Sequence, residues 1–586
     1  MKSLEKKLRF LPTTKEEMDT LGWKQLDVIF VSGDSYVDSP YNGVALLGRM
    51  LVSRGFKVGI IAQPDVKSGV DISRLGEPRL YWGVSAGSID SMVSNYTATK
   101  KFRKSDDFTP GGKNDRRPDR AVIVYTNLIK QHFKNTAPII LGGIEASLRR
   151  VTHYDFWSNK LRRSVLFDAK ADALVYGMGE NAVLEMTHQL NAGESIEEIR
   201  GLCYASTEAP EGYIHLPSHA ETVADKEAFI KMFRYFYVNM DPKNASGLVQ
   251  KVDSRYLVQN PPAHHLTMDE FDKVHEYNYC YEQHPYYEQE GSVRTLDTVR
   301  FSLNSQRGCY GECNFCAITV HQGRTVVSRS QESLVKEAKS YRSHPKWKGI
   351  ITDVGGPTAN MYGYECDKKI DHGVCKTKNC VFPKKCSLLK PDHKPQIDLL
   401  RELRSIPGVR KVFVASGLRY DLVQQDEKWG MEYLEELVTH HISGQMKIAP
   451  EHTQPDVVHT MGKPANDSLN KFCDMFHHLS EKSGKKQFLT YYFIAAHPGC
   501  TEDDMRAAKK YANQELNISP EQIQIFTPTP STWSSVMYYT EIDPFSGKKL
   551  FVEKDPRKKE RQKFALADKR RYPKSQHKRQ QPDVCS

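Results

Sequence analysis

Three cysteines on one short stretch of the chain are the residues best suited to chemistry. Residues 306–319 contain Cys309, Cys313 and Cys316, spaced as Cys-x3-Cys-x2-Cys. Three thiolates on one loop can ligate three irons of a four-iron cluster, which leaves the fourth iron open to a substrate or cofactor. A structural zinc site takes four ligands, normally in two well-separated Cys-x2-Cys pairs, and apolar packing explains one such cysteine better than three. The spacing therefore predicts an iron–sulfur cluster.

A second group of cysteines follows shortly afterwards in the chain. Cys366, Cys375, Cys380 and Cys386 lie in residues 362–392, a segment rich in Lys, Asp and Gly with almost no apolar core. Such a segment needs a staple to fold, and four thiolates can hold either a second iron–sulfur cluster or a zinc ion. The irregular spacing favours iron–sulfur over an ordinary zinc ribbon. Loop cysteines without a metal are the remaining alternative.

The composition is that of a chain with two or three folded domains. The chain has 586 residues, of which 39% are hydrophobic and 26% are charged, and no apolar run approaches the length of a membrane span. The first residues lack the apolar core of a signal peptide. Seven of the 12 cysteines lie between Cys309 and Cys386, which fits metal binding in a reducing compartment better than disulfides. We expect a cytoplasmic protein without a membrane partner.

The net charge of +11 is concentrated at the C-terminus. Residues 548–586 contain 14 Lys or Arg and 5 Asp or Glu, a net charge of +9, so the rest of the chain is nearly neutral. A nucleic-acid footprint over the whole surface is therefore not indicated. We assign residues 546–586 to a basic tail, which is either an arm that binds RNA or a solvated terminus.

Residues 1–200 alternate short apolar runs with helical patterns. This alternation predicts a doubly wound parallel sheet with helices on both faces. In residues 201–295 the pattern weakens, which predicts a connecting region, and the tyrosines of residues 277–287 are expected to pack the domains together. The predicted strands are 26–31, 57–62, 79–84, 138–142 and 172–176, and the predicted helices are 42–54, 121–134 and 180–191.

Residues 296–545 repeat a strand, a loop and a helix six times, which predicts a partial (β/α)6 barrel. The chemistry of such barrels lies on the loops at the carboxyl ends of the strands. Each predicted strand is indeed followed by a distinctive short motif, beginning with the Cys309–Cys316 loop. The predicted strands are 299–303, 349–354, 410–415, 444–449, 487–494 and 522–526. The later motifs are Gly355-Gly356-Pro357, Ser416-Gly417-Leu418-Arg419, Ala449-Pro450-Glu451-His452, His497-Pro498-Gly499-Cys500 and Thr527-Pro528-Thr529-Pro530.

The cysteine loop and the order of these motifs resemble the radical S-adenosylmethionine (SAM) superfamily, and the later segments resemble its YgiQ-type branch. The resemblance covers most of the chain. It implies a [4Fe-4S] cluster at the three loop cysteines, SAM at the open iron, and an electron donor such as flavodoxin or ferredoxin. Reductive cleavage of SAM would yield a 5′-deoxyadenosyl radical that abstracts a hydrogen from a substrate, with RNA as one candidate substrate.

The resemblance also assigns roles to residues at the strand ends. Gly355 and Gly356, followed by Pro357, would let the backbone accept hydrogen bonds from the methionyl ammonium of SAM. Ser416 offers a hydroxyl, and Arg419 offers donors suited to the carboxylate. The two remaining assignments are Glu451 for the ribose hydroxyls and Phe315 for the adenine.

The N-terminal half resembles the cobalamin-binding-like domain that precedes many radical SAM barrels. Cobalamin binding in such domains normally uses a His in an Asp-x-His-x-x-Gly pattern after the first strand. The corresponding loop here has Asp34 and Asp38 but no His. We therefore expect the fold without the cofactor.

Cys500 is a candidate catalytic residue, because a thiol on the active face could quench a radical or donate a hydrogen atom. The rival interpretation of the whole chain is a non-catalytic iron–sulfur or zinc protein for electron transfer or scaffolding. An ordinary SAM-dependent methyltransferase is a third interpretation, and it is disfavoured because its SAM site needs no cysteine loop.

Overall fold

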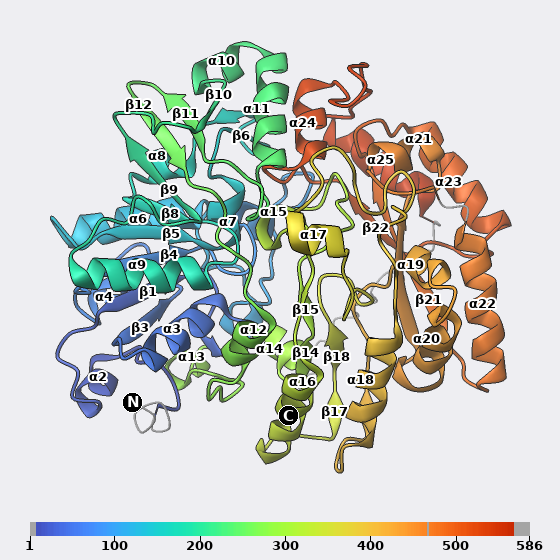
Figure 1. The fold of residues 1–586 in the computed structure, drawn as a ribbon, viewed down its shortest axis with the longest axis horizontal. Coiled ribbons are helices and arrows are strands. Elements are labelled where there is room, and N and C mark those ends of the chain that lie inside the picture. Colours follow the sequence, from blue (N-terminus) through green and yellow to red (C-terminus); the bar gives the residue numbers. More distant parts are fainter. Residues whose placement is uncertain (1–7, 466–467, 568–586) are drawn as a thin grey trace, which may run out of the picture.

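The computed structural model describes residues 8–465 and 468–567, which form two α/β halves lying side by side (Figure 1). The N-terminal half contains the sheet drawn in blue to green, and the C-terminal half contains the strands drawn in green to red. The predicted α/β fold class is confirmed. Within the described residues, no helix combines the length and the apolar character needed to cross a membrane.

The N-terminal half is built on one nine-stranded sheet in the order β10-β11-β12-β9-β8-β5-β4-β1-β3. The five strands from β8 to β3 are parallel, and they correspond to the five strands predicted from the sequence. They are β1 (Val28–Ser32), β3 (Val58–Ala62), β4 (Tyr81–Ser85), β5 (Ile139–Gly142) and β8 (Ala173–Val175).

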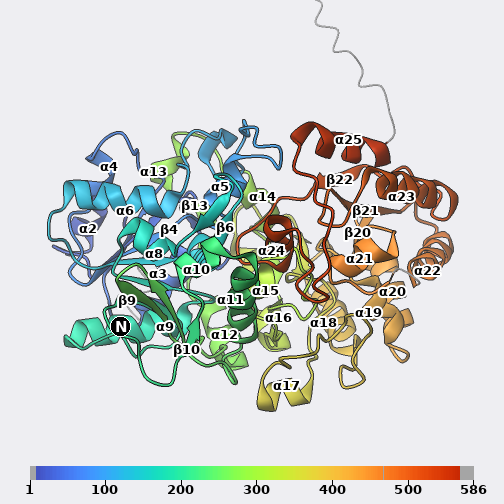
Figure 2. The same cartoon turned by 90° about the horizontal axis from the view of Figure 1, so that it is seen from above.

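Helices cover both faces of this sheet. α3 (Gly43–Ser53) and α9 (Glu180–Ala192) pack on one face, while α6 (Ala121–His132) and α8 (Val165–Ala169) pack together on the other. The view from above shows α6 and α9 on opposite sides of the sheet (Figure 2). The side chain of Tyr81 marks the first face, because its hydroxyl lies 2.9 Å from Thr187 Oγ1 of α9.

The sheet extends beyond residue 200, into the region that the sequence assigns to a connection. Four further strands lie here, and β8 pairs with β9 in the antiparallel sense. The weak hydrophobic periodicity of this region goes with a mixed arrangement, in which three of the four added strands run against the parallel strands of the same sheet. The added strands are β9 (Leu202–Ser206), β10 (Ile214–Leu216), β11 (Leu248–Val252) and β12 (Arg255–Gln259).

The C-terminal half is an open barrel of parallel strands. A parallel bridge between Leu418 and Ile448 joins its first strands to β20, β21 and β22. The first strand starts later than predicted because helix α14 (Thr295–Val299) occupies the start of the predicted range. The strands are β14 (Ser302–Asn304), β17 (Ile350–Ile351), β18 (Asp353–Gly355), β19 (Lys411–Val412), β20 (Gln445–Glu451), β21 (Phe488–Ala495) and β22 (Gln522–Ile525). The outer helices include α16 (Gln331–Ser340), α18 (Lys394–Ser405), α20 (Gly430–Glu436), α22 (Leu469–Lys482) and α23 (Glu502–Gln514).

The two halves share a hydrophobic core. The segment after β22 leaves the barrel, and its buried residues Phe526, Trp533 and Tyr538 belong to the core of the N-terminal half. Ser531 Oγ donates a hydrogen bond of 2.7 Å to the carbonyl of Leu148 in the same region. The motif after the sixth strand therefore contributes to packing between the halves.

The first part of the basic tail folds against the barrel. Residues 556–566 form helix α25 (Pro556–Leu566), which packs on α23 and β22. Lys559 on this helix is only 1% exposed, and its ammonium donates to the hydroxyl of Tyr538 at 2.9 Å. This part of the tail is thus structural, and residues 568–586 lie outside the described residues.

The buried Lys559 gives the protein a pH-dependent stability. Burial, together with the nearby charge of Lys100, lowers the pKa of Lys559 to about 8. Between this value and its value of about 10.4 in the unfolded chain, the unfolded state binds the extra proton, so the free energy of unfolding rises with pH by at most about 1.4 kcal/mol per pH unit. We expect the thermal midpoint of the native protein to rise relative to that of Lys559→Met between pH 8 and pH 10. The exposed Lys558→Met is the control, and a pH-independent difference for Lys559→Met would contradict the assignment.

Candidate active site

The cysteine loop connects a short strand to a short helix at the barrel mouth. β15 (Gln306–Arg307) pairs antiparallel with β16 (Val327–Ser328), and α15 (Ile318–Gln322) follows the last cysteine. Gly308 between strand and loop has a φ of 81°, and a Cβ there would lie 2.0 Å from the carbonyl oxygen of Thr325. Only glycine fits this position, so the turn into the cysteine loop is fixed by a backbone contact.

The three cysteines of the loop lie close together and are half-buried. A Cβ at Gly311 would lie 3.2 Å from Cys309 Sγ and 3.9 Å from Cys313 Sγ, so these two sulfurs flank the same glycine. Burial raises the pKa of Cys316, and the other two thiols raise it further. For Cys313, burial also raises the pKa while Lys463 and Arg419 counteract it. The loop therefore gathers its three sulfurs near two cations.

A buried ion pair anchors the cysteine loop. Glu312, which is 1% exposed and lies between the first two cysteines, has its Oε2 3.2 Å from Arg324 Nη1. The hydroxyl of Tyr237 in the N-terminal half donates to the same carboxylate oxygen at 3.2 Å. Both charged groups are shielded from water. Removing either partner would therefore leave the other as an unpaired buried charge and would lower the stability of the loop strongly.

The glycine loop after β18 lies against the cysteine loop. A Cβ at Gly356 would lie 2.4 Å from the carbonyl oxygen of Gln306, so the backbones of the two loops are in contact. The hydroxyl of Thr358 lies 3.6 Å from Cys309 Sγ. At Gly355 a Cβ would lie 3.2 Å from Ser416 Oγ. The structure thus brings together the predicted glycines, Ser416 and the first cysteine.

Ser416 and Arg419 are both engaged by aspartates that the sequence analysis did not single out. The hydroxyl of Ser416 donates to Asp353, whose other oxygen accepts from the Ser416 amide at 3.2 Å. Arg419 Nη2 pairs with Asp421 Oδ2 at 2.6 Å, and Arg419 Nε donates to Asp421 Oδ1 at 3.0 Å. The remaining donor Arg419 Nη1 lies 2.8 Å from the Cβ position of Gly311. One edge of the guanidinium is therefore held by Asp421 while the other faces the cysteine loop.

Glu451 lies at the end of β20 beside a half-buried lysine, Lys463. Its φ of 68° is in the left-handed region, which is a strained conformation for a non-glycine residue. Burial raises the pKa of Glu451, while Lys463 and Arg419 lower it. Lys463 Nζ lies 3.8 Å from Glu451 Oε1 and also donates to the carbonyl of Ala449. Lys463 has no motif in the sequence and is recognised only through this contact.

Phe315 and Cys500 occupy different environments at the fifth strand. Phe315 is half-buried, packs against the cores of both halves, and meets the ring of His497 edge-on with centroids 6.3 Å apart. Cys500 is fully buried in the barrel core, with its sulfur 3.6 Å from His452 Nε2. Burial raises the pKa of its thiol to about 12. The sequence analysis expected Cys500 on the active face; the structure places its side chain in the barrel core, and a role in radical chemistry stays a prediction.

The cysteine-rich insertion packs against the cysteine loop. Cys366 is buried in a small core against which Cys309 and Cys380 also pack. The amide of Cys386 donates to the carbonyl of Cys380 at 2.9 Å. Three of the four insertion cysteines are therefore neighbours. Cys375 is half-buried on the same loop.

Within residues 8–465 and 468–567, no three Cys, His, Asp or Glu side chains already converge on one metal position. The Cys309–Cys316 loop fits a four-iron cluster by its donor set: three half-buried thiols of one loop, with Arg419 and Lys463 as neighbouring cations. Positive charge beside the loop favours the thiolate form that ligates iron.

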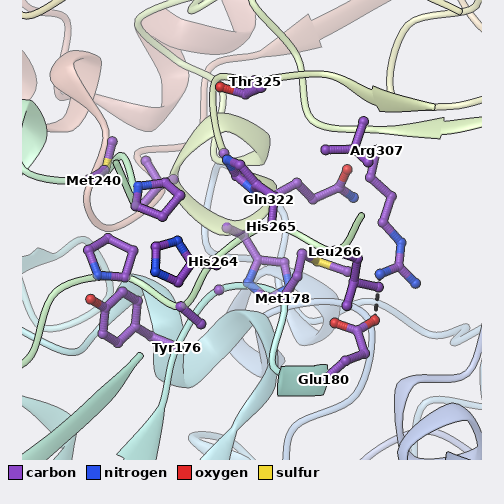
Figure 3. A pocket seen from close by; sticks show the side chains of 18 of the residues that line it. Tyr176, Met178, Glu180, Met240, His264, His265, Leu266, Arg307, Gln322 and Thr325 are labelled. Atoms are coloured by element: carbon purple, nitrogen blue, oxygen red, sulfur yellow. Dashed lines mark hydrogen bonds and ion pairs between the residues drawn. The ribbon is translucent and has the colours of Figure 1, made fainter. Parts of the chain in front are cut away.

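A small pocket of about 60 Å³ lies between the cysteine loop and the N-terminal sheet (Figure 3). Arg307, two residues before the first cysteine, forms an ion pair with Glu180 at the start of α9, drawn as a dashed line in Figure 3. His264, His265 and His321 also line this pocket. Desolvation lowers the pKa of each of these histidines, and that of His321 to about 4. The pocket shows that the N-terminal sheet reaches the flank of the cysteine loop.

The comparisons with known proteins agree with this arrangement. Residues 10–302 match the radical SAM N-terminal family, and residues 303–512 match the radical SAM superfamily. A UPF0313 protein of Fusobacterium nucleatum is 56% identical over 565 residues, which is 96% of this chain and 100% of that protein. A UPF0313 protein of Thermotoga petrophila is 48% identical over 548 residues, covering 93% of this chain and 96% of that protein.

A solved structure is also similar. It is the radical S-adenosylmethionine methyltransferase TsrM from Kitasatospora setae with cobalamin and a [4Fe-4S] cluster bound. The TM-score is 0.50 at 14% sequence identity, covering 87% of this chain and 77% of that chain, and this likeness concerns the fold alone. The family matches and the relatives together show that the chain belongs to the radical SAM superfamily, and within it to the UPF0313 proteins.

Proposed function

We propose that Cys309, Cys313 and Cys316 hold the [4Fe-4S] cluster of this radical SAM enzyme and that the surrounding strand ends hold SAM. The observation that supports this most directly is the contact of the cysteine loop with the glycine loop and Arg419 at the barrel mouth. When bound, the cluster and SAM supply one-electron cleavage to a 5′-deoxyadenosyl radical. The chain's own residues orient SAM and keep water out.

Each proposed SAM contact has a distinct task. The backbone at Gly355 and Gly356, with no side chain in the way, accepts from an ammonium group. Arg419 presents Nη1 to a carboxylate while Asp421 fixes its orientation. Glu451, held near Lys463, accepts from ribose hydroxyls, and Phe315 packs against the adenine. Pro357 stiffens the glycine loop, and Ser416 tethers it to Asp353.

The function is tested with the full-length protein after anaerobic reconstitution with iron and sulfide. We expect the reduced protein to convert SAM to 5′-deoxyadenosine and methionine, measured by liquid chromatography. A well-formed cluster that leaves SAM intact would refute the enzyme in favour of an electron-transfer or scaffold protein. Flavodoxin and ferredoxin, tested in place of a chemical reductant, would identify the electron donor.

The insertion is proposed to hold its own metal at Cys366, Cys375, Cys380 and Cys386. Support comes from the shared packing of Cys366 and Cys380 with Cys309 of the cluster loop, and from the backbone hydrogen bond that joins Cys386 to Cys380. In a variant with Ala at the three loop cysteines, we expect metal analysis to find iron, or alternatively zinc, at up to one site per chain. Further replacement of Cys366 and Cys380 should remove that metal, and retention of the same amount would contradict the assignment.

RNA remains a candidate substrate through the terminal residues 568–586, which carry six Lys or Arg against two Asp. Because α25 is packed against the barrel, the informative truncation ends at residue 567. If the tail grips phosphates, the truncated protein should lose RNA affinity, and the affinity of the full chain should fall steeply with salt. Equal RNA binding by both proteins would exclude this role.

A further inference from the structure

A large cavity lies inside the N-terminal half, separate from the proposed SAM site. Its volume is about 430 Å³, and it lies between the sheet and the helices α3 and α9. From the barrel it is reached by Arg307 and His321, which flank the cysteine loop on either side. The residues proposed above to bind SAM do not line it.

The cavity exists because three neighbouring strands end in small residues. Ser32, Ser85 and Gly142 are partners in register across β1, β4 and β5. The preceding row on the same face contains Phe30 and Ile140, whose bulk closes the cavity toward the inside of the sheet. Side chains of one row share a face, so the small row leaves a flat platform beneath the helices.

A buried carboxylate oxygen at the edge of this platform has no partner. Glu180 is 3% exposed and lines the cavity, and its Oε1 is paired with Arg307, as Figure 3 shows. Its Oε2 is buried and accepts no hydrogen bond from any described residue. An ionised carboxylate is an acceptor only, so this oxygen calls for an N–H or O–H donor from a ligand.

The cavity offers no free positive charge to an anion. Among the described residues that line it, Arg307 is the only lysine or arginine, and Glu180 neutralises it. Burial and the nearby Arg150 lower the pKa of His321 to about 4, so its ring is neutral at pH 7. Asp34 is paired with Arg117 at 2.7 Å. A phosphate-bearing ligand would therefore find no counter-charge here.

We propose that this cavity binds an uncharged planar ring compound whose N–H or O–H group donates to Glu180. The flat ring lies on the Ser32, Ser85 and Gly142 platform, and its apolar edge faces α3 and α9. Such a compound is either a second cofactor or the substrate itself. Its contact with Arg307 and His321 would connect its occupancy to the cysteine loop.

The test uses the reconstituted full-length protein and two neutral fluorescent probes. One probe is 7-amino-4-methylcoumarin, which has N–H donors, and the other is its dimethylamino analogue, which has none. We expect saturable binding of the amino probe at one site per chain. Glu180→Gln keeps an acceptor for Arg307 but presents no acceptor to the ligand. It should therefore weaken binding of the amino probe by about 2- to 10-fold and leave the affinity for the dimethylamino probe unchanged.

A filling variant tests the location. Gly142 has an extended backbone, and a Cβ there would meet only the carbonyl oxygen of Val175 at 4.0 Å, so Gly142→Leu projects into the open space. We expect this variant to lose binding of both probes by about tenfold or more, whereas Gly142→Ala retains it. A carboxylated coumarin should bind about tenfold more weakly than the amino probe.

Three results would overturn the proposal: no saturable binding to the native protein, unchanged binding by Gly142→Leu, or equal effects of Glu180→Gln on both neutral probes. Because no SAM or reductant is present, these results are independent of the proposed SAM chemistry. To separate the two sources, a compound found bound is incubated with reductant and SAM deuterated at the 5′ position. Chemical conversion of the compound, or its uptake of deuterium by reversible transfer, identifies a substrate, and an unlabelled, unchanged compound identifies a cofactor.

Discussion

Replacement of Cys309, Cys313 and Cys316 by Ala in one variant is expected to abolish 5′-deoxyadenosine formation. Removing even one thiolate leaves the cluster with two protein ligands, so each single variant should also lose activity by about a hundredfold or more. The measurement is product formation under reducing conditions, together with the iron content and the electron paramagnetic resonance signal of the reduced cluster.

A cysteine outside both groups serves as the matched control. Cys473 is 5% exposed in the barrel core, and its sulfur lies 3.2 Å from the hydroxyl of Tyr491. Cys473→Ala should retain the cluster signal and the activity while lowering stability through a small cavity. Product formation by the triple loop variant would show that the radical chemistry uses other ligands.

Replacement of Arg324 by Met is expected to destabilise the cysteine loop by about 3–5 kcal/mol, because Glu312 would be left buried without its cation. The effect should appear as faster hydrogen exchange of backbone amides in residues 309–323 and as loss of iron during dialysis. Both measurements report on the loop itself, which matters because a chain with several domains need not unfold in two states.

Two further variants separate charge from packing. In the double variant Glu312→Leu with Arg324→Met the unpaired charge is gone, so most of the loop stability should return. Arg506→Met breaks an exposed pair with Glu502 on α23 and should leave the loop unchanged. If Arg324→Met behaves like Arg506→Met, the buried pair does not support the loop.

The sequence predicted the barrel well because its signals are local. Each strand is a short apolar run, and each motif lies directly after a strand, so the parallel arrangement brings the motifs together at one edge. Gly356 and Gln306 illustrate this: 50 residues apart in sequence, they touch because their strands are neighbours.

The sequence could not predict the partners that the motifs meet. In the sequence, Glu312 is indistinguishable from a surface charge. In the structure it pairs with Arg324 and accepts a hydrogen bond from Tyr237, which belongs to the N-terminal half. Lys463 belongs to none of the sequence motifs that predicted the site. Asp421 had a weak signal, since it follows Arg419 by two residues.

Burial explains the two expectations that changed most. Cys500 follows a strand in the expected order, but its position points into the core rather than toward the mouth. The basic residues of 548–567 predicted a solvated tail or an RNA arm, yet helix α25 turns Lys559 inward. Charge counts along a chain cannot distinguish these outcomes, because only the fold decides which side of a helix meets solvent.

Helix α25 also has a consequence for synthesis of the protein. Gln562 on this helix accepts from the amide of Ala496 and donates to the carbonyl of Cys500, so the last described helix closes the loop after β21. Residues near 533 and 538 complete the core of the half that is made first. Neither half can therefore reach its final packing before the segment after β22 has been made, and we expect iron incorporation to follow synthesis of that segment.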